Sequence, residues 1–268
     1  MFRAAIAGVV ILAGLVPRLR RTARVNLRIA FGPSGPGLYM RTLTRLAENV
    51  SAVVRACRRN PNRRPVIRFD VDRYRSIVQE PPPYVCVTGH FGPFELWSLV
   101  QDAMNTKLDV VVRTPKKWLS RRALSFVRGR LGTNVIDKKN VMRETIRSLS
   151  EGRSVALLAD HNAGYHGVFV PFLGFPASTT RLPAMLARKF NRPILMGFIR
   201  REGNEYVAWI ERAIRPDPSA QDDADERRML TEMNAVFSDV IRKYPEEWFW
   251  FHRRWKTRPG DMEAHILR

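Results

Sequence analysis

The sequence is poor in cysteine and has no long uncharged apolar stretch. Two cysteines in 268 residues, Cys57 and Cys86, are too few for a disulfide framework or a cysteine-based zinc cluster, and they suit a reducing compartment. No uncharged apolar run approaches about 18 residues, which excludes a polytopic membrane protein. Apolar residues nevertheless make up 45% of the chain, which is enough to build a core and excludes a disordered protein.

Acidic residues and lysine are also scarce. The chain has 25 Asp and Glu against 46 Lys and Arg, a formal charge of +21, and only 8 of the basic residues are lysine. Residues 1–75 contain 16 arginines, no lysine and three acidic residues. Arginine forks match phosphate and carboxylate oxygens, and so uneven a charge indicates a polyanionic partner. Charge alone leaves both nucleic acid and anionic lipid open.

The N-terminal residues favour lipid. Residues 4–16, AAIAGVVILAGLV, are apolar, and they are followed by Arg18, Arg20, Arg21, Arg24 and Arg28. As a helix this run would extend about 20 Å, short of the roughly 30 Å hydrocarbon core. A secretory signal has its basic residues before the apolar run, whereas arginines after it keep that side in the cytoplasm. We therefore predict a membrane-anchoring segment over residues 1–35 and one domain of catalytic size over 36–268. The alternative is a first helix packed on the domain.

Strand-like and helix-like segments alternate through the rest of the chain. Apolar residues at helical spacing predict a helix over residues 38–59, ended by Pro61. Runs rich in Val, Ile and Leu predict strands at 66–69, 84–88, 108–112, 134–136, 155–159, 168–170, 193–199 and 206–210. Further helices are predicted at 94–104, 119–131, 141–150, 181–190, 222–243 and about 246–251. Because the strands are apolar on both faces, we expect an α/β fold with a central, mostly parallel or mixed sheet flanked by helices.

The strongest local signal for chemistry is HFGPFE, residues 90–95. It follows a buried strand, and Pro93 suits the first position of the next helix. Glu95 could then fold back on His90, hold one ring N–H and leave the other nitrogen free to accept a proton. Gly92 lets a substrate approach the backbone. The residues alone also allow a simpler interpretation, in which Glu95 caps a helix and His90 is a structural turn residue.

HFGPFE resembles the His–x4–Asp/Glu motif of glycerolipid acyltransferases. Further stretches resemble, in the same order, those of the bacterial lipid A biosynthesis acyltransferases. They are RTARVNLRIAFG near the N-terminus, the strand that leads to Asp160, the segment FVPFLGFPA after it, and YPEEWFWFHRRWKTRP at 244–259. The resemblance covers nearly the whole chain and implies an enzyme that transfers a fatty acyl chain.

The resemblance also implies a mechanism. His90 would act as general base on a lipid or sugar hydroxyl, Glu95 would orient it, and the alkoxide would attack an acyl thioester directly. No acyl-enzyme, metal or cofactor is needed, and the sequence has no G-x-S-x-G elbow. Arg113 would bind a phosphate or assist the oxyanion, and Asp160 would position the site or the acceptor.

Other residues are expected to serve the substrates. Arg253 and Arg254 are predicted to lie on phosphates beside packed tryptophans, although the same basic and aromatic stretch could stack on nucleic acid. An acyl groove, or plain core, is predicted for Phe169, Pro171, Phe172, Leu173 and Phe175. His161 and His166, with Asp160, could in principle ligate a metal, but they lack a three-ligand spacing and we predict no metal site.

The chain departs from the family's pattern at two places. It has RTPKKW at 113–118 where the family usually has Arg-Pro-x-x-Asn-Pro, and His161 where the family usually has Gln. These differences bear on the acceptor more than on the reaction.

The combined prediction is a membrane-associated O-acyltransferase, peripheral or monotopic, on the cytoplasmic face of a bacterial inner membrane. Acyl carrier protein is the favoured donor because it is acidic, and the acceptor is a phosphorylated glycolipid resembling a lipid A precursor. The alternatives are an acyl-CoA donor, a different glycolipid or phospholipid acceptor, and a non-enzymatic protein that binds nucleic acid or an anionic membrane.

Overall fold

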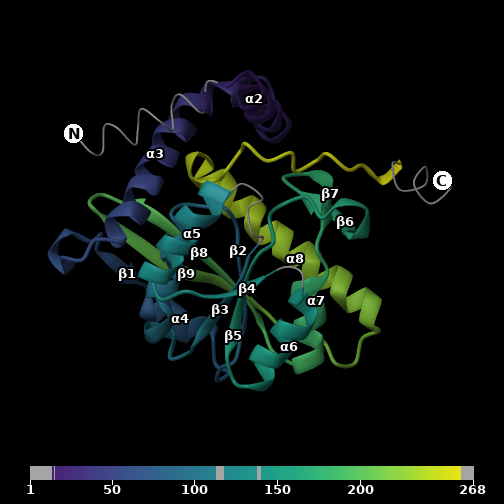
Figure 1. The fold of residues 1–268 in the computed structure, drawn as a ribbon. Coiled ribbons are helices and arrows are strands. Elements are labelled where there is room, and N and C mark those ends of the chain that lie inside the picture. Colours follow the sequence, from purple (N-terminus) through teal and green to yellow (C-terminus); the bar gives the residue numbers. More distant parts are fainter. Residues whose placement is uncertain (1–13, 15, 113–117, 138–139, 261–268) are drawn as a thin grey trace.

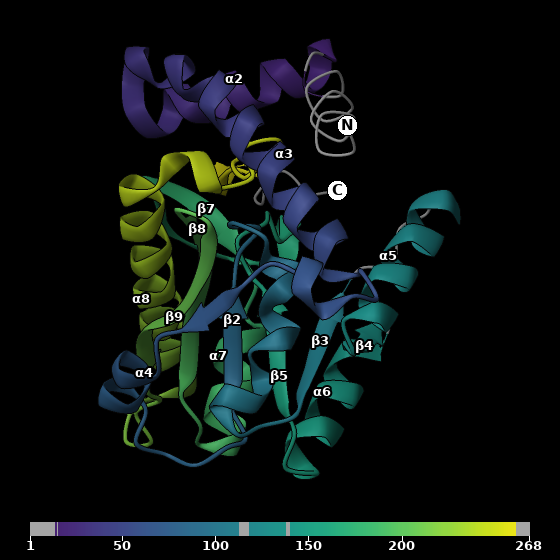
Figure 2. The ribbon, with the colours of Figure 1, turned by 90° about the vertical axis from the view of Figure 1, so that its left-hand side faces the viewer.

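The structure is a computed structural model that describes residues 14, 16–112, 118–137 and 140–260. Most of the predicted anchor run, and Arg113, lie outside these residues. Within them, helices cover both faces of a seven-stranded sheet (Figures 1 and 2). The predicted α/β fold is confirmed.

The sheet is mostly parallel, with the strand order β1-β9-β8-β2-β5-β3-β4. Its strands are β1 (Ile67–Phe69), β2 (Val85–Thr88), β3 (Leu108–Val112), β4 (Asn134–Asp137), β5 (Ser154–Leu158), β8 (Ile194–Glu202) and β9 (Glu205–Ile214). Only the β8–β9 hairpin pairs antiparallel among the strand pairs of this described sheet. A separate hairpin joins β6 (Val168–Phe172) to β7 (Phe175–Thr179), and β7 has no counterpart among the predicted strands.

The α-helices are α2 (Pro17–Phe31), α3 (Tyr39–Ala56), α4 (Val71–Ile77), α5 (Trp118–Arg130), α6 (Val141–Ser150), α7 (Leu182–Phe190) and α8 (Asp222–Lys243). Short 3-10 helices are η1 (Gly32–Leu38), η2 (Pro61–Arg63), η3 (Phe94–Leu99), η4 (Gln101–Met104), η6 (Gly164–His166) and η7 (Pro245–Glu247). The single helix predicted for residues 94–104 is wrong, because the chain forms η3 and η4 on either side of Val100. The unpredicted α4 begins after Asp70, whose side chain accepts a hydrogen bond from the Arg73 N–H (3.1 Å) and so caps the helix.

The sheet separates two apolar cores. Successive side chains of a strand point to opposite faces, so Val85 and Val87 of β2 pack in the larger core with α7 and α8. Cys86, between them, packs in the second core with η3, η4 and parts of α3 and α4. Burial on both faces explains why the central strands are almost continuously apolar.

Helix α2 lies across the end of the molecule that also holds the C-terminal segment, residues 248–258 (Figure 2). Its Ala23 and Leu27 are fully buried, and Asn26 donates hydrogen bonds to the carbonyls of Trp250 (2.7 Å) and His252 (2.6 Å). The described part of the predicted anchor is therefore packed on the domain by one face. Among the described residues, no helix is both long enough and apolar enough to cross a bilayer.

Candidate active site

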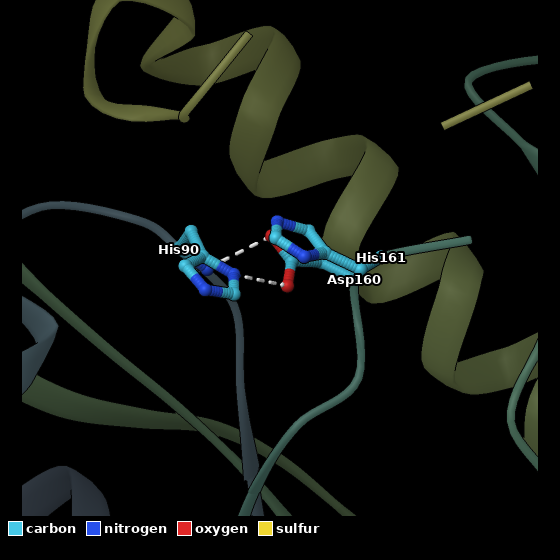
Figure 3. Close-up of side chains that lie close together, drawn as sticks. All are labelled: His90, Asp160 and His161. Atoms are coloured by element: carbon cyan, nitrogen blue, oxygen red, sulfur yellow. Dashed lines mark hydrogen bonds and ion pairs between the residues drawn. The ribbon is translucent and has the colours of Figure 1, made fainter. Parts of the chain in front are cut away.

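Parallel pairing of β2 with β5 brings His90 next to Asp160. Thr88 lies opposite Leu158 at the ends of the two strands, so the residues two positions further along meet beyond the sheet. The His90 Nδ1 atom lies 2.9 Å from Asp160 Oδ1, and the His90 backbone N–H donates to Asp160 Oδ2 at 2.8 Å (Figure 3). The site therefore occupies the carboxyl end of adjacent strands, where α/β folds commonly bind ligands.

The Asp160 carboxylate is fully buried and accepts a third hydrogen bond, from the Trp248 indole N–H at 2.8 Å. Burial by itself would raise the pKa of Asp160, but attraction to His90 and the hydrogen bonds outweigh it and hold the pKa well below its usual range. A carboxylate can only accept, so in the neutral imidazole the Nδ1 atom carries the proton and Nε2 has the free lone pair. Among the described residues no hydrogen bond occupies Nε2, and the His90 side chain is 25% exposed. This geometry can supply a general base.

Glu95 does not orient His90 as expected. Its carboxylate is held by Arg128 of α5, with Nη2 to Oε1 at 2.9 Å and Nε to Oε2 at 3.3 Å. The 3-10 helix η3 directs Glu95 toward α5, whereas Asp160 already lies across from His90 through the strand register. The carboxylate on the His90 ring is therefore that of Asp160.

An apolar cavity lies between the sheet and η3. Thr88, Glu95 and Arg128 line it, and Thr88 is only two residues before His90. Its apolar wall includes Cys86, Phe94, Trp97, Met104, Val110, Ala156, Leu158, Leu195 and Ile210. The Phe94 ring also lies against the His90 ring, 5.0 Å between centroids, so the cavity and His90 are neighbours.

The C-terminal segment and the preceding Glu247 fix the loop that carries His90. The Phe249 N–H donates to the His90 carbonyl at 2.9 Å, and the Gly92 N–H donates to the Glu247 carbonyl at 2.9 Å. Gly92 has φ +58°, and a Cβ there would lie 1.8 Å from the Ile199 carbonyl oxygen. The structure thus gives Gly92 a part in backbone packing, and its contact with a substrate stays a prediction.

Two other predicted substrate contacts are core residues. The Phe172 ring is fully buried beside Trp248 (5.4 Å between centroids) and does not line the cavity. Arg254 is also fully buried, lies over Phe172, and donates to the Ser178 carbonyl and the Thr179 hydroxyl. Burial lowers the pKa of Arg254 to about 10, and both of its terminal nitrogens donate inside the protein, so it does not lie on a phosphate as predicted. Arg253 is exposed, and Arg113 lies outside the described residues.

His90, Asp160 and His161 each place a possible metal-ligand atom within 4.8 Å of the others. The His90 and His161 rings, however, stack in nearly parallel planes, with centroids 3.8 Å apart and 5° between planes. A nitrogen lone pair lies in the plane of its ring, so one ion cannot lie along the lone pairs of both rings. His90 Nδ1 is also bonded to Asp160. This arrangement is that of a stacked pair and does not fit a metal centre.

The sequence did not predict the contacts of Arg128 with Glu95 or of Trp248 with Asp160. Arg128 is one of many arginines, and nothing in the sequence places it opposite Glu95. Trp248 stands in the basic and aromatic stretch that was assigned to packing, and only the folded chain brings its indole N–H to Asp160.

Comparison with known proteins identifies the family. Residues 1–257 match the model of the bacterial lipid A biosynthesis acyltransferases. The chain belongs to that family. It is 29% identical over 139 residues to the lipid A biosynthesis lauroyltransferase of Escherichia coli K12, covering 51% of this chain and 45% of that protein.

Other members of the lipid A acyltransferase family are similarly distant. The chain is 28% identical over 145 residues to the lipid A biosynthesis palmitoleoyltransferase of Escherichia coli K12, covering 52% of this chain and 46% of that protein. It is also 28% identical over 145 residues to a lipid A biosynthesis acyltransferase of Haemophilus influenzae, covering 52% and 45%. The chain spans about half the length of the curated relatives it matches.

Proposed function

We propose that this protein transfers a fatty acyl chain from an acyl thioester to a hydroxyl of a phosphorylated glycolipid that resembles a lipid A precursor. The observation that carries the proposal is the His90–Asp160 pair next to an apolar cavity, in a chain of the lipid A acyltransferase family. A base for the hydroxyl and a site for the acyl chain are the two features that this reaction requires.

In the proposed reaction, His90 Nε2 removes the proton of the acceptor hydroxyl as its oxygen attacks the thioester carbonyl. The buried Asp160 charge compensates the imidazolium that forms. The tetrahedral intermediate then expels the thiolate, which takes the proton from His90. The products are the new ester and the free thiol of the donor, and no acyl-enzyme forms. Arg113 remains the proposed contact for a phosphate or the oxyanion.

The cavity is the proposed site of the acyl chain. Its wall is apolar except for a few groups, which suits the hydrocarbon of an acyl chain. The ion pair of Glu95 with Arg128 lies in the same wall, and their side chains are only 13% and 14% exposed. We assign this pair to shaping the cavity and binding the thioester portion of the donor.

The α2 surface is the proposed contact with an anionic membrane. Among the described residues, none of its five arginines forms an ion pair with a carboxylate, in contrast to most arginines on α6 and α8. Exposed Val16, Leu19 and Val25 lie among these arginines. Apolar side chains interleaved with arginine suit the headgroup layer, where both lipid phosphate and hydrocarbon are within reach. We place the protein on the cytoplasmic face of the inner membrane by this surface.

The same positive charge suits an acidic acyl carrier protein as donor, since opposite charges speed and orient association. Acyl-CoA is the alternative donor, and a phospholipid or another glycolipid is the alternative acceptor. A non-enzymatic protein that binds anionic membranes or nucleic acid would use the same charge but would not need the His90–Asp160 pair.

The test is acyl transfer by the purified protein in vesicles. The donors are acyl carrier protein and coenzyme A, each carrying a labelled acyl chain as a thioester. The acceptors are a phosphorylated glycolipid and a phospholipid. The proposal predicts an ester product on the glycolipid and a loss of at least about 100-fold in kcat for His90→Ala. His166→Ala, which changes an exposed histidine, is the matched control and should keep full activity. Wild-type activity in His90→Ala would overturn the mechanism.

A further inference from the structure

A column of three stacked imidazole rings begins at the proposed base. The His90 ring stacks on His161 (3.8 Å between centroids, 5° between planes), and His161 stacks on His252 (3.7 Å, 8°). The rings come from three separate segments: the loop after β2, the residues after β5, and the C-terminal segment. The reaction chemistry described above uses only the first of them.

We propose that His161 and His252 are positioning residues that hold the His90 ring with Nδ1 on Asp160 and Nε2 toward the substrates. This inference rests on the proposed function. The ring of His161 covers one face of the His90 ring, while Asp160 fixes one edge, so rotation of His90 away from Asp160 would break the stack. His252 supports His161 from the far side in the same way.

Both supporting rings are suited to this role because they are neutral. Burial lowers the pKa of His161 to about 3 and that of His252 to about 4, and the Arg254 charge adds to the effect. His252 Nε2 also accepts a hydrogen bond from the Asn162 backbone N–H (3.0 Å), so that nitrogen carries no proton. A neutral aromatic face next to His90 does not repel the positive charge that the ring acquires when it takes the hydroxyl proton.

The backbone of the column is fixed at each step. The His161 carbonyl accepts from Arg254 at 3.3 Å, and the His252 carbonyl accepts from Asn26 at 2.6 Å. Asn26 belongs to α2, the helix that carries the proposed membrane surface. The column therefore connects that helix to the base through contacts that are all within the described residues.

His161 is the position to change, because its ring touches that of His90 and is not among the donors to the Asp160 carboxylate. His161→Ala removes the ring on which His90 lies, and His161→Phe restores a flat ring without nitrogen. We expect kcat to fall roughly 10- to 100-fold in His161→Ala with KM nearly unchanged, and to recover in His161→Phe to within about threefold of wild type. His166→Ala, five residues further on and exposed, is the control.

Two results would overturn the inference. One is wild-type kcat in His161→Ala. The other is a His161→Phe protein that is folded, by its thermal unfolding, and as slow as His161→Ala, since the ring nitrogens and not the stack would then be required.

A readout independent of activity separates this inference from the proposed function. Imidazole ¹H–¹⁵N NMR spectra of the wild-type protein should show His90 as the Nδ1–H tautomer, and His161→Ala should lose that single form while His166→Ala keeps it. If the wild-type protein transfers no acyl chain, the proposed function fails and the spectra still test the column. An unchanged His90 signal in His161→Ala would contradict the positioning role.

Discussion

Asp160 is the residue on which the contacts of the site converge. Its buried carboxylate accepts from the His90 backbone, the His90 ring and the Trp248 indole, all between 2.8 and 2.9 Å. A buried charge is costly unless hydrogen bonds and an opposite charge compensate it. Here two of the three donors belong to His90, so the environment of Asp160 also fixes the position of the His90 ring.

Substitutions of Asp160 and Glu95 should affect different kinetic constants. Asp160→Asn keeps the shape but removes the charge and admits the wrong imidazole tautomer, so we expect kcat to fall by about 10²- to 10⁴-fold. Glu95→Gln breaks the pair with Arg128 in the cavity wall and should mainly raise KM for the acyl donor. Steady-state kinetics with varied donor measure both. A severe kcat loss in Glu95→Gln beside a mild one in Asp160→Asn would assign the orienting role to Glu95.

At the residue scale, sequence identified both His90 and Asp160 but not their partnership. Each could be placed at the end of an apolar strand, because such strands are continuous runs of Val, Ile and Leu. Their partnership depends on the strand order, in which β2 lies next to β5. Strand order depends on how distant segments pack, and the sequence of neither strand predicts it. Glu95 was the nearest carboxylate in sequence, and proximity in sequence was misleading.

At the scale of elements, the cavity is formed where η3 and η4 cross the second face of the sheet. The apolar pattern of residues 94–104 gave no indication of this break. Over so few turns, the spacing of apolar residues in an α-helix is similar to that in a 3-10 helix. By contrast, α8 has the predicted bounds of residues 222–243, since a long amphipathic pattern with acidic residues in the first turn and basic residues in the last is unambiguous.

A larger side chain in the cavity wall should change donor preference. Ala156 of β5 lines the cavity, and Ala156→Leu would fill part of it. We expect kcat/KM to fall more for a long acyl donor than for a short one. The ratio of the two kcat/KM values should change by about 10- to 200-fold, the range expected when methylene contacts are lost. Ala224→Leu, on the exposed side of α8, is the control. Equal effects on both donors would place the acyl chain elsewhere.

Glu247 connects α3 to the segment that fixes the His90 loop. Its buried carboxyl accepts from Asn49 (3.0 Å) and lies 3.2 Å from Arg45 Nε. Burial raises the pKa of Glu247 to about 7, which Asn49 and Arg45 oppose only in part. In the unfolded chain the pKa is about 4.3.

The pKa of Glu247 predicts the direction of a pH effect on stability. Between about pH 4.3 and 7 the folded protein holds a proton that the unfolded chain has released. The stabilising contribution is thus complete at low pH and is lost as the pH rises through about 7. Glu247→Gln should reduce the loss of unfolding free energy between pH 5 and 8, whereas Glu151→Gln, at an exposed carboxylate, should not. Denaturant unfolding at each pH measures this, and parallel curves for wild type and Glu247→Gln would refute it.

At the scale of the whole molecule, α2 and the C-terminal segment lie at one end (Figure 2). The C-terminal segment accepts hydrogen bonds from Asn26 of α2 and donates one to the His90 carbonyl. Charge and composition predicted a polyanionic partner but could not place the arginines relative to the site. The structure relates them through Asn26, whose buried amide ties α2 to the C-terminal segment. A membrane bound by α2 would therefore lie near the proposed base, His90.

Membrane binding should depend on the arginines of α2, which form no ion pair within the described part of the chain. Changing Arg20, Arg24 and Arg28 to Gln removes about 1 kcal/mol each near an anionic surface, so affinity for phosphatidylglycerol vesicles should fall roughly 100-fold. The matched control changes Arg143, Arg147 and Arg242, which are exposed but paired with carboxylates. Binding by wild type should also weaken with added salt. Equal losses in both triple variants would show that only net charge matters.

The most direct test of the central claim is the lipid composition of a strain that lacks this protein. Mass spectrometry should show a glycolipid missing one acyl chain, restored by the wild-type gene and by His166→Ala but not by His90→Ala or Asp160→Asn. The mass difference would give the length of the acyl chain. Restoration of the chain by His90→Ala, at normal protein levels, would contradict acyl transfer by the His90–Asp160 site.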